Sequence, residues 1–229
     1  MRNGYNQLGF DNFVIDCSII GFEDPPVELK SGRLSHFYVD WRKVLGTVDG
    51  VQLISGYILG FAKLEGLEPN CYYGVPAGAT SLGVVTQYRW VTSHEDFMER
   101  HYPLSVGREN PKDHGKPKDK YFVGMPEGKT VVIEDTVTTG GSLIKEITKL
   151  LETEIDVKAA IVLTDRNEKR ADGSSVAQAV RDLGVDYYTM SSALELLPIA
   201  YQRQKIGKRI GRKIEDEFRE FGVKALKIA

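Results

Sequence analysis

Residues 130–144 read TVVIEDTVTTGGSLI and decide the fold. Val131, Val132 and Ile133 form a continuous β-branched run, which is typical of a strand buried on both faces of a sheet. Glu134 and Asp135 follow at the carboxyl end of this strand, where open α/β sheets bind their ligands. The stretch therefore predicts a buried strand with a binding site at its end.

Small and hydroxyl-bearing residues follow the two acids and lead into an expected helix that begins near Ser142. Their backbone N–H groups can close around a phosphate, to which the helix adds the positive end of its dipole. The two carboxylates can accept hydrogen bonds from hydroxyls beside that phosphate, which favours a sugar phosphate over a bare anion. The spacings GxxxxGK[ST] and GxGxxG are both absent from this stretch. An ordinary strand, turn and capped helix is the alternative interpretation.

The stretch resembles the phosphoribosyl pyrophosphate (PRPP) motif of type I phosphoribosyltransferases, in which two acids separate a hydrophobic strand from a Thr/Gly loop. The resemblance implies that Glu134 and Asp135 hold the ribose hydroxyls and that the loop holds the 5′-phosphate. It assigns the remaining PRPP contacts of this stretch to Thr136, Val137, Thr138, Thr139, Gly140, Gly141 and Ser142.

The composition is that of a globular protein, with 229 residues and a net charge of −2. This charge gives no general attraction to nucleic acid or to anionic membranes, and no run of about 18 apolar residues predicts a transmembrane helix. The first residues lack the apolar core of a signal peptide. Cys17 and Cys71 do not make a disulfide framework, so we expect a cytoplasmic protein.

Strands and helices alternate along the chain, which predicts a mostly parallel sheet with right-handed crossovers. We expect strands at 71–75, 102–106, 130–133, 158–163 and 186–190, and two short strands within 28–39. We expect helices over 48–66, 81–88, 143–153 and 175–183, and the end of a helix at 12–20. Residues 108–120 and 164–174 read as polar loops, the first of them exposed and mobile.

These elements predict an α/β protein with the type I phosphoribosyltransferase fold, in which helices flank a central, mostly parallel sheet. The transferase domain is expected over 1–191, with a small hood largely from 1–45. Residues 192–229 have helical periodicity and many charges, so we expect a helical C-terminal extension whose basic run belongs to a solvated face.

Residues 28–40, ELKSGRLSHFYVD, are similar to the orotate phosphoribosyltransferase pattern LKSGR-x-S followed by aromatic or apolar residues. The resemblance implies that Lys30 reaches the PRPP end of the site, and that Phe37 and Tyr38 lie where the base is bound. Taken alone, this segment reads as a hairpin.

Residues 74–79, GVPAGA, are similar to the family's loop that wraps the pyrophosphate through main-chain amides. Small residues allow the backbone to approach an anion closely. The resemblance assigns this role to Val75, Pro76, Ala77 and Gly78. Some family members carry a lysine here and this chain does not, so the contact would rest on backbone N–H groups. A tight turn before a helix is the alternative.

Residues 108–115, RENPKDHG, are similar to the orotate-enzyme loop R-K-x-x-K-x-H-G. The resemblance places Arg108, Lys112 and His114 on PRPP, with Lys112, His114 and Asp135 as the catalytic residues. In the family this loop closes over PRPP and reaches the neighbouring subunit's site, which implies a homodimer whose 108–120 loop does the same. Glu109 stands where the family usually has lysine, and the nearby cations that could offset it are Lys116, Lys118 and Lys120.

Residues 163–168, LTDRNE, match the family's strand end, whose arginine pairs with the orotate carboxylate. Arg166 takes that role, since a planar guanidinium meets a carboxylate in two parallel hydrogen bonds. Phe37, Tyr38 and Thr138 complete the expected orotate contacts. The family often continues with two glycines, whereas residues 169–173 lengthen the loop here, which bears on base specificity.

The resemblance implies transfer of ribosyl 5-phosphate from PRPP to orotate, giving orotidine 5′-monophosphate and pyrophosphate in UMP biosynthesis. Mg²⁺ is the implied cofactor, held mainly by PRPP and not by protein ligands. Two alternatives stay open: a transferase of the same fold for another base, and a non-catalytic PRPP-binding regulatory protein. Glu109 and the lengthened loop favour the second of these.

Overall fold

The computed structural model describes residues 5–99, 101–113 and 120–229. Its centre is a parallel sheet in the order β3-β6-β7-β8. The strands are β3 (Cys71–Gly74), β6 (Thr130–Val137), β7 (Val157–Asp165) and β8 (Asp186–Thr189). The expected parallel sheet is thereby confirmed. The expected strands 130–133 and 158–163 were too short, because β6 and β7 stay paired as far as Val137 and Asp165.

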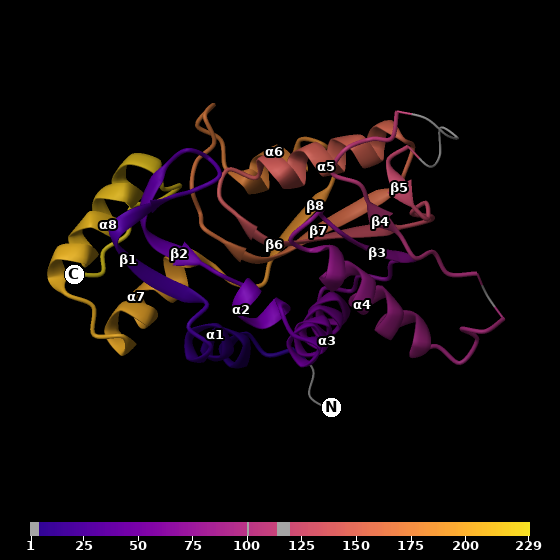
Figure 1. The fold of residues 1–229 in the computed structure, drawn as a ribbon, viewed down its shortest axis with the longest axis horizontal. Helices are drawn as coiled ribbons and strands as arrows, with labels where there is room; N and C mark the ends of the chain where they lie inside the picture. Colours follow the sequence, from indigo (N-terminus) through magenta and orange to yellow (C-terminus); the bar gives the residue numbers. More distant parts are fainter. Residues whose placement is uncertain (1–4, 100, 114–119) are drawn as a thin grey trace.

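Helices cover both faces of this sheet (Figure 1). One face carries α5 (Gly141–Glu152) and α6 (Val176–Arg181), and the other carries α1 (Gln7–Asp16), α3 (Val48–Leu64), α4 (Thr80–Thr92) and α7 (Ala193–Arg203). The strand sequence alternates accordingly. Val131 and Ile133 belong to the core beneath α3, whereas Val132 belongs to the core beneath α5. This two-sided burial explains why β6 is continuously apolar.

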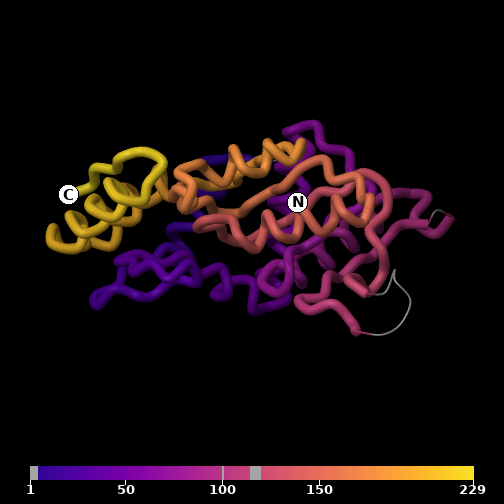
Figure 2. Tube along the Cα trace, turned by 90° about the horizontal axis from the view of Figure 1, so that it is seen from above, coloured from indigo at the N-terminus to yellow at the C-terminus, as the bar shows by residue number. Residues whose placement is uncertain are grey.

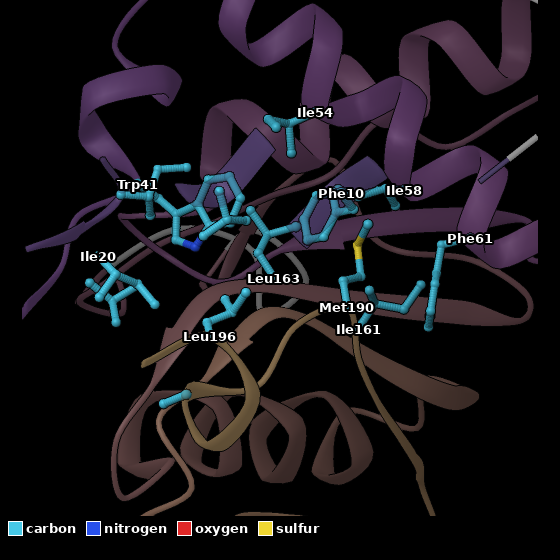
Figure 3. Packing of buried hydrophobic residues seen from close by; sticks show 14 of the residues in the cluster. Phe10, Ile20, Trp41, Ile54, Ile58, Phe61, Ile161, Leu163, Met190 and Leu196 are labelled. Atoms are coloured by element: carbon cyan, nitrogen blue, oxygen red, sulfur yellow. The ribbon is translucent and has the colours of Figure 1, made fainter. Parts of the chain in front are cut away.

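The core beneath α3 is the larger of the two, and Figure 3 shows part of it. Phe10 of α1 lies between Ile54 and Ile58 of α3 on one side and Ile161 and Leu163 of β7 on the other. Because aromatic and branched side chains from three elements meet here, the core fixes the sheet edge that carries the polar strand ends.

An antiparallel hairpin of β1 (Ile20–Glu28) and β2 (Leu34–Val39) stands beside the sheet, followed by the short α2 (Arg42–Leu45). The C-terminal helix α8 (Lys208–Phe221) lies along this hairpin. Two segments from opposite ends of the sequence, the hairpin and α8, are therefore neighbours (Figures 1 and 2). A second small pair joins β4 (Val106–Gly107) to β5 (Phe122–Val123).

Several expected boundaries were wrong. The helix expected at 12–20 ends at Asp16, because β1 begins at Ile20. The first strand of the hairpin therefore starts before residue 28, where it was expected, because the Pro25–Pro26 pair in the sequence argued against a strand there. The strand expected at 102–106 starts only at Val106, because Pro103 offers no N–H and its carbonyl accepts from Gln87. The C-terminal extension is two helices, and the boundary at 191/192 stays a prediction.

Both C-terminal helices pack into the core beneath α3, through Leu196 and Leu197 of α7 and Ile214 and Phe218 of α8. Of the helices in the described ranges, none has the length and apolar character needed to cross a membrane.

Candidate active site

Two neighbouring strands, β3 and β6, end at one edge of the sheet beside a cavity of about 540 Å³. The loop after β3, the end of β6 with the loop after it, and the turn between β1 and β2 form its walls. Most of the expected PRPP residues line it: Lys30, Pro76, Ala77, Gly78, Glu134, Asp135, Thr136, Val137, Thr138, Thr139, Gly140, Gly141 and Ser142. Val75 is the exception in its loop, because its side chain is buried in the core beneath α5.

The start of α5 is built to receive an anion. Gly140 caps the helix in the left-handed conformation, with φ 68°, and makes no side-chain capping hydrogen bond. A Cβ on Gly140 would lie 2.6 Å from Cγ1 of Val176, so only glycine fits this position. With no side-chain cap and no acidic residue in its first turn, the helix keeps its first N–H groups for a ligand. This helix start therefore lacks the side-chain cap that the alternative of an ordinary capped helix would use.

Cations face this helix start from two elements. Lys30, in the turn after β1, donates from Nζ to Oγ of Ser142 across 3.1 Å. Lys145, one turn into α5, also lines the cavity and was missed in the sequence, although its spacing from Ser142 places it there. Glu109 lines the same cavity, so Lys30 and Lys145 are the cations that the described residues place opposite it.

The two acids of β6 differ in their surroundings. The Glu134 side chain is buried, whereas Asp135 is only partly so. Oδ1 of Asp135 accepts from the Thr136 N–H at 2.7 Å, and a Cβ added to Gly78 would lie 3.5 Å from either carboxylate oxygen. Burial raises the pKa of both carboxyl groups, and for Glu134 the neighbouring Asp135 charge raises the pKa further. In the ligand-free protein, ionisation of these two carboxyl groups therefore lowers the free energy of unfolding.

Replacing Glu134 by glutamine is expected to stabilise the ligand-free protein by about 1 kcal/mol at pH 8. The pKa of Glu134 is raised in the folded state, so the ionised carboxylate lowers the free energy of unfolding above that pKa. The gain should shrink as the pH falls and vanish below about pH 4, where the unfolded chain is protonated too. Urea denaturation at several pH values measures it.

Glu152→Gln is the matched control, because Glu152 is exposed at the end of α5. The interpretation of the acid pair would be wrong if Glu134→Gln destabilised the ligand-free protein at pH 8. PRPP affinity should fall in the same variant, since an amide accepts only at one atom where the carboxylate accepts at two.

A second cavity, of about 240 Å³, adjoins the first and shares Lys30, Asp135, Thr136 and Thr138 with it. Its other lining residues come from the turn after β1, from β2 and the residues after it, and from the residue that follows β7: Leu29, Tyr38, Val39, Asp40, Trp41, Arg42 and Arg166. Asp40 and Arg42 were not singled out in the sequence. They form an ion pair at 2.8 Å beside Tyr38, whose hydroxyl also accepts from Arg42.

Arg166 reaches this second cavity from a buried position. Its Nε donates to Oε1 of Glu168 at 2.9 Å, Nη1 donates to the Phe37 carbonyl at 3.2 Å and Nη2 donates to Oγ of Ser35 at 2.9 Å. Burial lowers the pKa of Arg166, and the Glu168 charge opposes that shift. The Phe37 ring lies 3.8 Å from the guanidinium and packs into the core, so only Tyr38 of the expected aromatic pair lines the cavity.

The described parts of the 108–120 loop are tied at both ends. The Arg108 N–H donates to the Tyr121 carbonyl at 2.8 Å, and the Lys112 N–H donates to the Lys120 carbonyl at 2.9 Å. The Lys112 side chain is exposed, and Nε of Arg108 is buried without a hydrogen-bond partner. His114, Lys116 and Lys118 lie outside the described residues.

Comparison with known proteins gives the family. The chain is 31% identical to the orotate phosphoribosyltransferase of Sorangium cellulosum over 185 residues, which are 77% of this chain and 87% of that protein. The chain belongs to the orotate phosphoribosyltransferase family. No family model matches it.

Two further likenesses agree with this family. The uridine 5'-monophosphate synthase of Caenorhabditis elegans is 26% identical over 207 residues, 90% of this chain, but the match spans only 38% of that longer protein. The crystal structure of orotate phosphoribosyltransferase from Francisella tularensis superimposes with a TM-score of 0.67 at 17% identity, covering 93% of this chain and 99% of that one. The type I phosphoribosyltransferase fold predicted from the sequence is thereby confirmed.

Proposed function

We propose that this family member transfers ribosyl 5-phosphate from PRPP to orotate, giving orotidine 5′-monophosphate and pyrophosphate. One observation carries the proposal: two cavities meet at Asp135, Thr136 and Thr138. The larger one has the open helix start that suits a 5′-phosphate, and the smaller one has Tyr38 and Arg166 to meet a planar anionic base. The anomeric carbon of PRPP and the ring nitrogen of the base would meet at their junction.

In the reaction, the bond from the anomeric carbon to the pyrophosphate oxygen breaks and its electron pair leaves with pyrophosphate. The ring nitrogen of orotate then forms the new C–N bond with the anomeric carbon, and the proton that this nitrogen carried passes to the leaving pyrophosphate or to water. The ribose passes through a cation-like state, so Asp135 beside it favours the transition state over the ground state. The negative charge that grows on pyrophosphate would be stabilised by the backbone N–H groups of Ala77 and Gly78 and by the Lys112 ammonium. These interactions are strongest in the transition state.

The expected cofactor is Mg²⁺, which would bind with PRPP and would neutralise negative charge on the leaving pyrophosphate. Within residues 5–99, 101–113 and 120–229, no cluster of three or more His, Cys, Asp or Glu residues forms a metal site. Asp135 is partly exposed and lines the cavity, so its carboxylate, which also accepts from the Thr136 N–H, offers a hard oxygen there. This donor set fits an ion held mainly by PRPP and water.

We also propose a homodimer whose 108–120 loops reach the neighbouring sites. An exposed apolar surface supports it. Val48 on α3 is 86% exposed and Tyr88 on α4 is 66% exposed, and together with Leu45 and Val85 they border a cavity of about 490 Å³. A large apolar patch rimmed by polar groups is typical of a protein interface.

Two cysteines without a disulfide support the cytoplasmic location that the sequence suggested.

Mixing two inactive variants tests the crossing of the loops. Lys112→Ala damages only the loop, and Asp135→Asn damages only the cavity floor. If each loop serves the neighbouring site, random hybrids restore about one quarter of the wild-type activity, since half the dimers carry one intact site. Mixtures that stay inactive, with hybrids confirmed by native mass spectrometry, would show that each loop serves its own site.

The activity itself is tested by the loss of orotate ultraviolet absorbance in the presence of protein, PRPP and Mg²⁺. Loss that needs all three, and that stops when a chelator removes the metal, supports the proposal. Binding of PRPP by calorimetry without turnover of any base would favour the regulatory alternative. Glu109 in the PRPP cavity is the observation behind that alternative.

A further inference from the structure

The C-terminal helix α8 reaches the base-binding end of the site through one carboxylate. Oε1 of Glu217 accepts from the His36 N–H at 2.8 Å and lies 2.7 Å from Nδ1 of His36. Oε2 of Glu217 accepts from the Ser35 hydroxyl at 2.8 Å. These hydrogen bonds join residues that are far apart in the sequence. Helix α8 is therefore attached to β2 by hydrogen bonds as well as by Phe218, which stacks on Phe37.

Ser35 carries the link onward to Arg166. Its hydroxyl is buried and has one proton, with Glu217 and the Phe37 carbonyl, 2.9 Å away, as competing acceptors. The charged carboxylate is the stronger acceptor, so the proton points to Glu217. The lone pairs of Ser35 are then free to accept from Nη2 of Arg166 at 2.9 Å. The order of donors thus runs from Arg166 through Ser35 to Glu217.

We propose that Glu217 is a positioning residue for the base site: by orienting Ser35, it holds the Arg166 guanidinium toward the 240 Å³ cavity. The inference rests on the proposed function, because Arg166 meets the base only if the protein binds one. It assigns the C-terminal extension a part in base recognition that the charged run of 208–220 did not suggest. Glu217 itself does not line that cavity.

Glu217→Gln tests the proposal, because the amide has the shape of the carboxylate but replaces one acceptor oxygen with a donor NH₂ group. If its oxygen stays on His36, its NH₂ group donates to Ser35 and competes with Nη2 of Arg166 for the same oxygen. We expect the KM for orotate to rise about tenfold, while kcat and the KM for PRPP stay within about twofold. The preference for orotate over uracil, which lacks the carboxylate, should fall by a similar factor.

Glu220→Gln is the matched control on the same helix, since Glu220 is exposed, and it should leave every constant unchanged. Ser35→Ala cuts the same chain of bonds from the other side. In the double variant the two effects should not add, because each single change already breaks the link. An unchanged KM for orotate in both single variants, or equal losses for orotate and PRPP, would overturn the proposal.

A readout without substrate separates this inference from the proposed function. Arginine side-chain NMR of the ligand-free protein, with the Arg166 signals identified by Arg166→Lys, reports rotation of its guanidinium. Faster rotation in Glu217→Gln but not in Glu220→Gln supports the positioning role. Unchanged rotation overturns it, even if orotate is turned over. Failure of the wild-type protein to act on orotate would contradict the proposed function. The NMR result would still show whether Glu217 positions the Arg166 guanidinium.

Discussion

Replacing Lys112 by alanine is expected to lower kcat for orotate by about 10²–10³-fold, the usual loss when one preorganised charge is removed from a transition state. The Lys112 side chain is exposed, while its N–H bonds to the Lys120 carbonyl and keeps the two arms of the loop together. The substitution therefore removes the charge and leaves the backbone contact. Steady-state kinetics with saturating PRPP measure the loss.

Lys129→Ala provides the control, because Lys129 is an exposed lysine on the turn before β6. It should keep full activity, and neither variant should change the melting temperature by more than about 2 °C, as is usual for exposed positions. A Lys112→Ala protein with wild-type kcat would remove this residue from the catalytic step.

Replacing Arg166 by methionine is expected to lower the free energy of unfolding by about 3 kcal/mol, because a buried carboxylate loses a partner. Glu168 bonds to Arg166 through Oε1 and to Arg33 through Oε2 at 2.9 Å, so Arg33 keeps the loss at the low end of the range. Urea denaturation measures this change. The same variant should bind orotate too weakly to saturate.

Adding Glu168→Gln to Arg166→Met separates stability from recognition. The double variant should regain part of the lost stability, since the unpaired buried charge is gone, but orotate binding should stay lost. Equal stability of Arg166→Met and the wild type would show that Glu168 is satisfied by Arg33 alone. In that case the buried network around Arg166 would contribute recognition without contributing to the fold.

The cavity at the expected phosphate end was predictable because most of the residues that line it are consecutive in the sequence. The run from Val131 to Ser142 holds the strand, the acids and the helix start, and each has a local signature. The base end was less predictable, because its parts come together only in the fold. Arg42 lies just after β2, two residues beyond the motif of residues 28–40, and the motif itself does not indicate that Arg42 lines the cavity.

The C-terminal extension shows a signal that the charges concealed. Ile210, Ile214 and Phe218 recur at four-residue spacing within the charged run, which indicates one apolar face on α8. That face is buried at Ile214 and Phe218. The spacing predicts that the helix docks, but it contains no information on the partner, so the contact of Glu217 with β2 could come only from three-dimensional packing.

The lengthened loop after Arg166 has a consequence for engineering. Arg170 donates from Nη1 to the Thr139 carbonyl at 2.9 Å, so a residue of the loop after β7 anchors the backbone of the loop after β6. A graft that replaced residues 169–173 by the two glycines typical of relatives would leave that carbonyl without its donor. On the proposed function, exchanges aimed at changing the accepted base are therefore expected to weaken sugar-phosphate binding as well. Specificity and cosubstrate affinity cannot be redesigned separately in this chain unless a new donor for Thr139 is built in first.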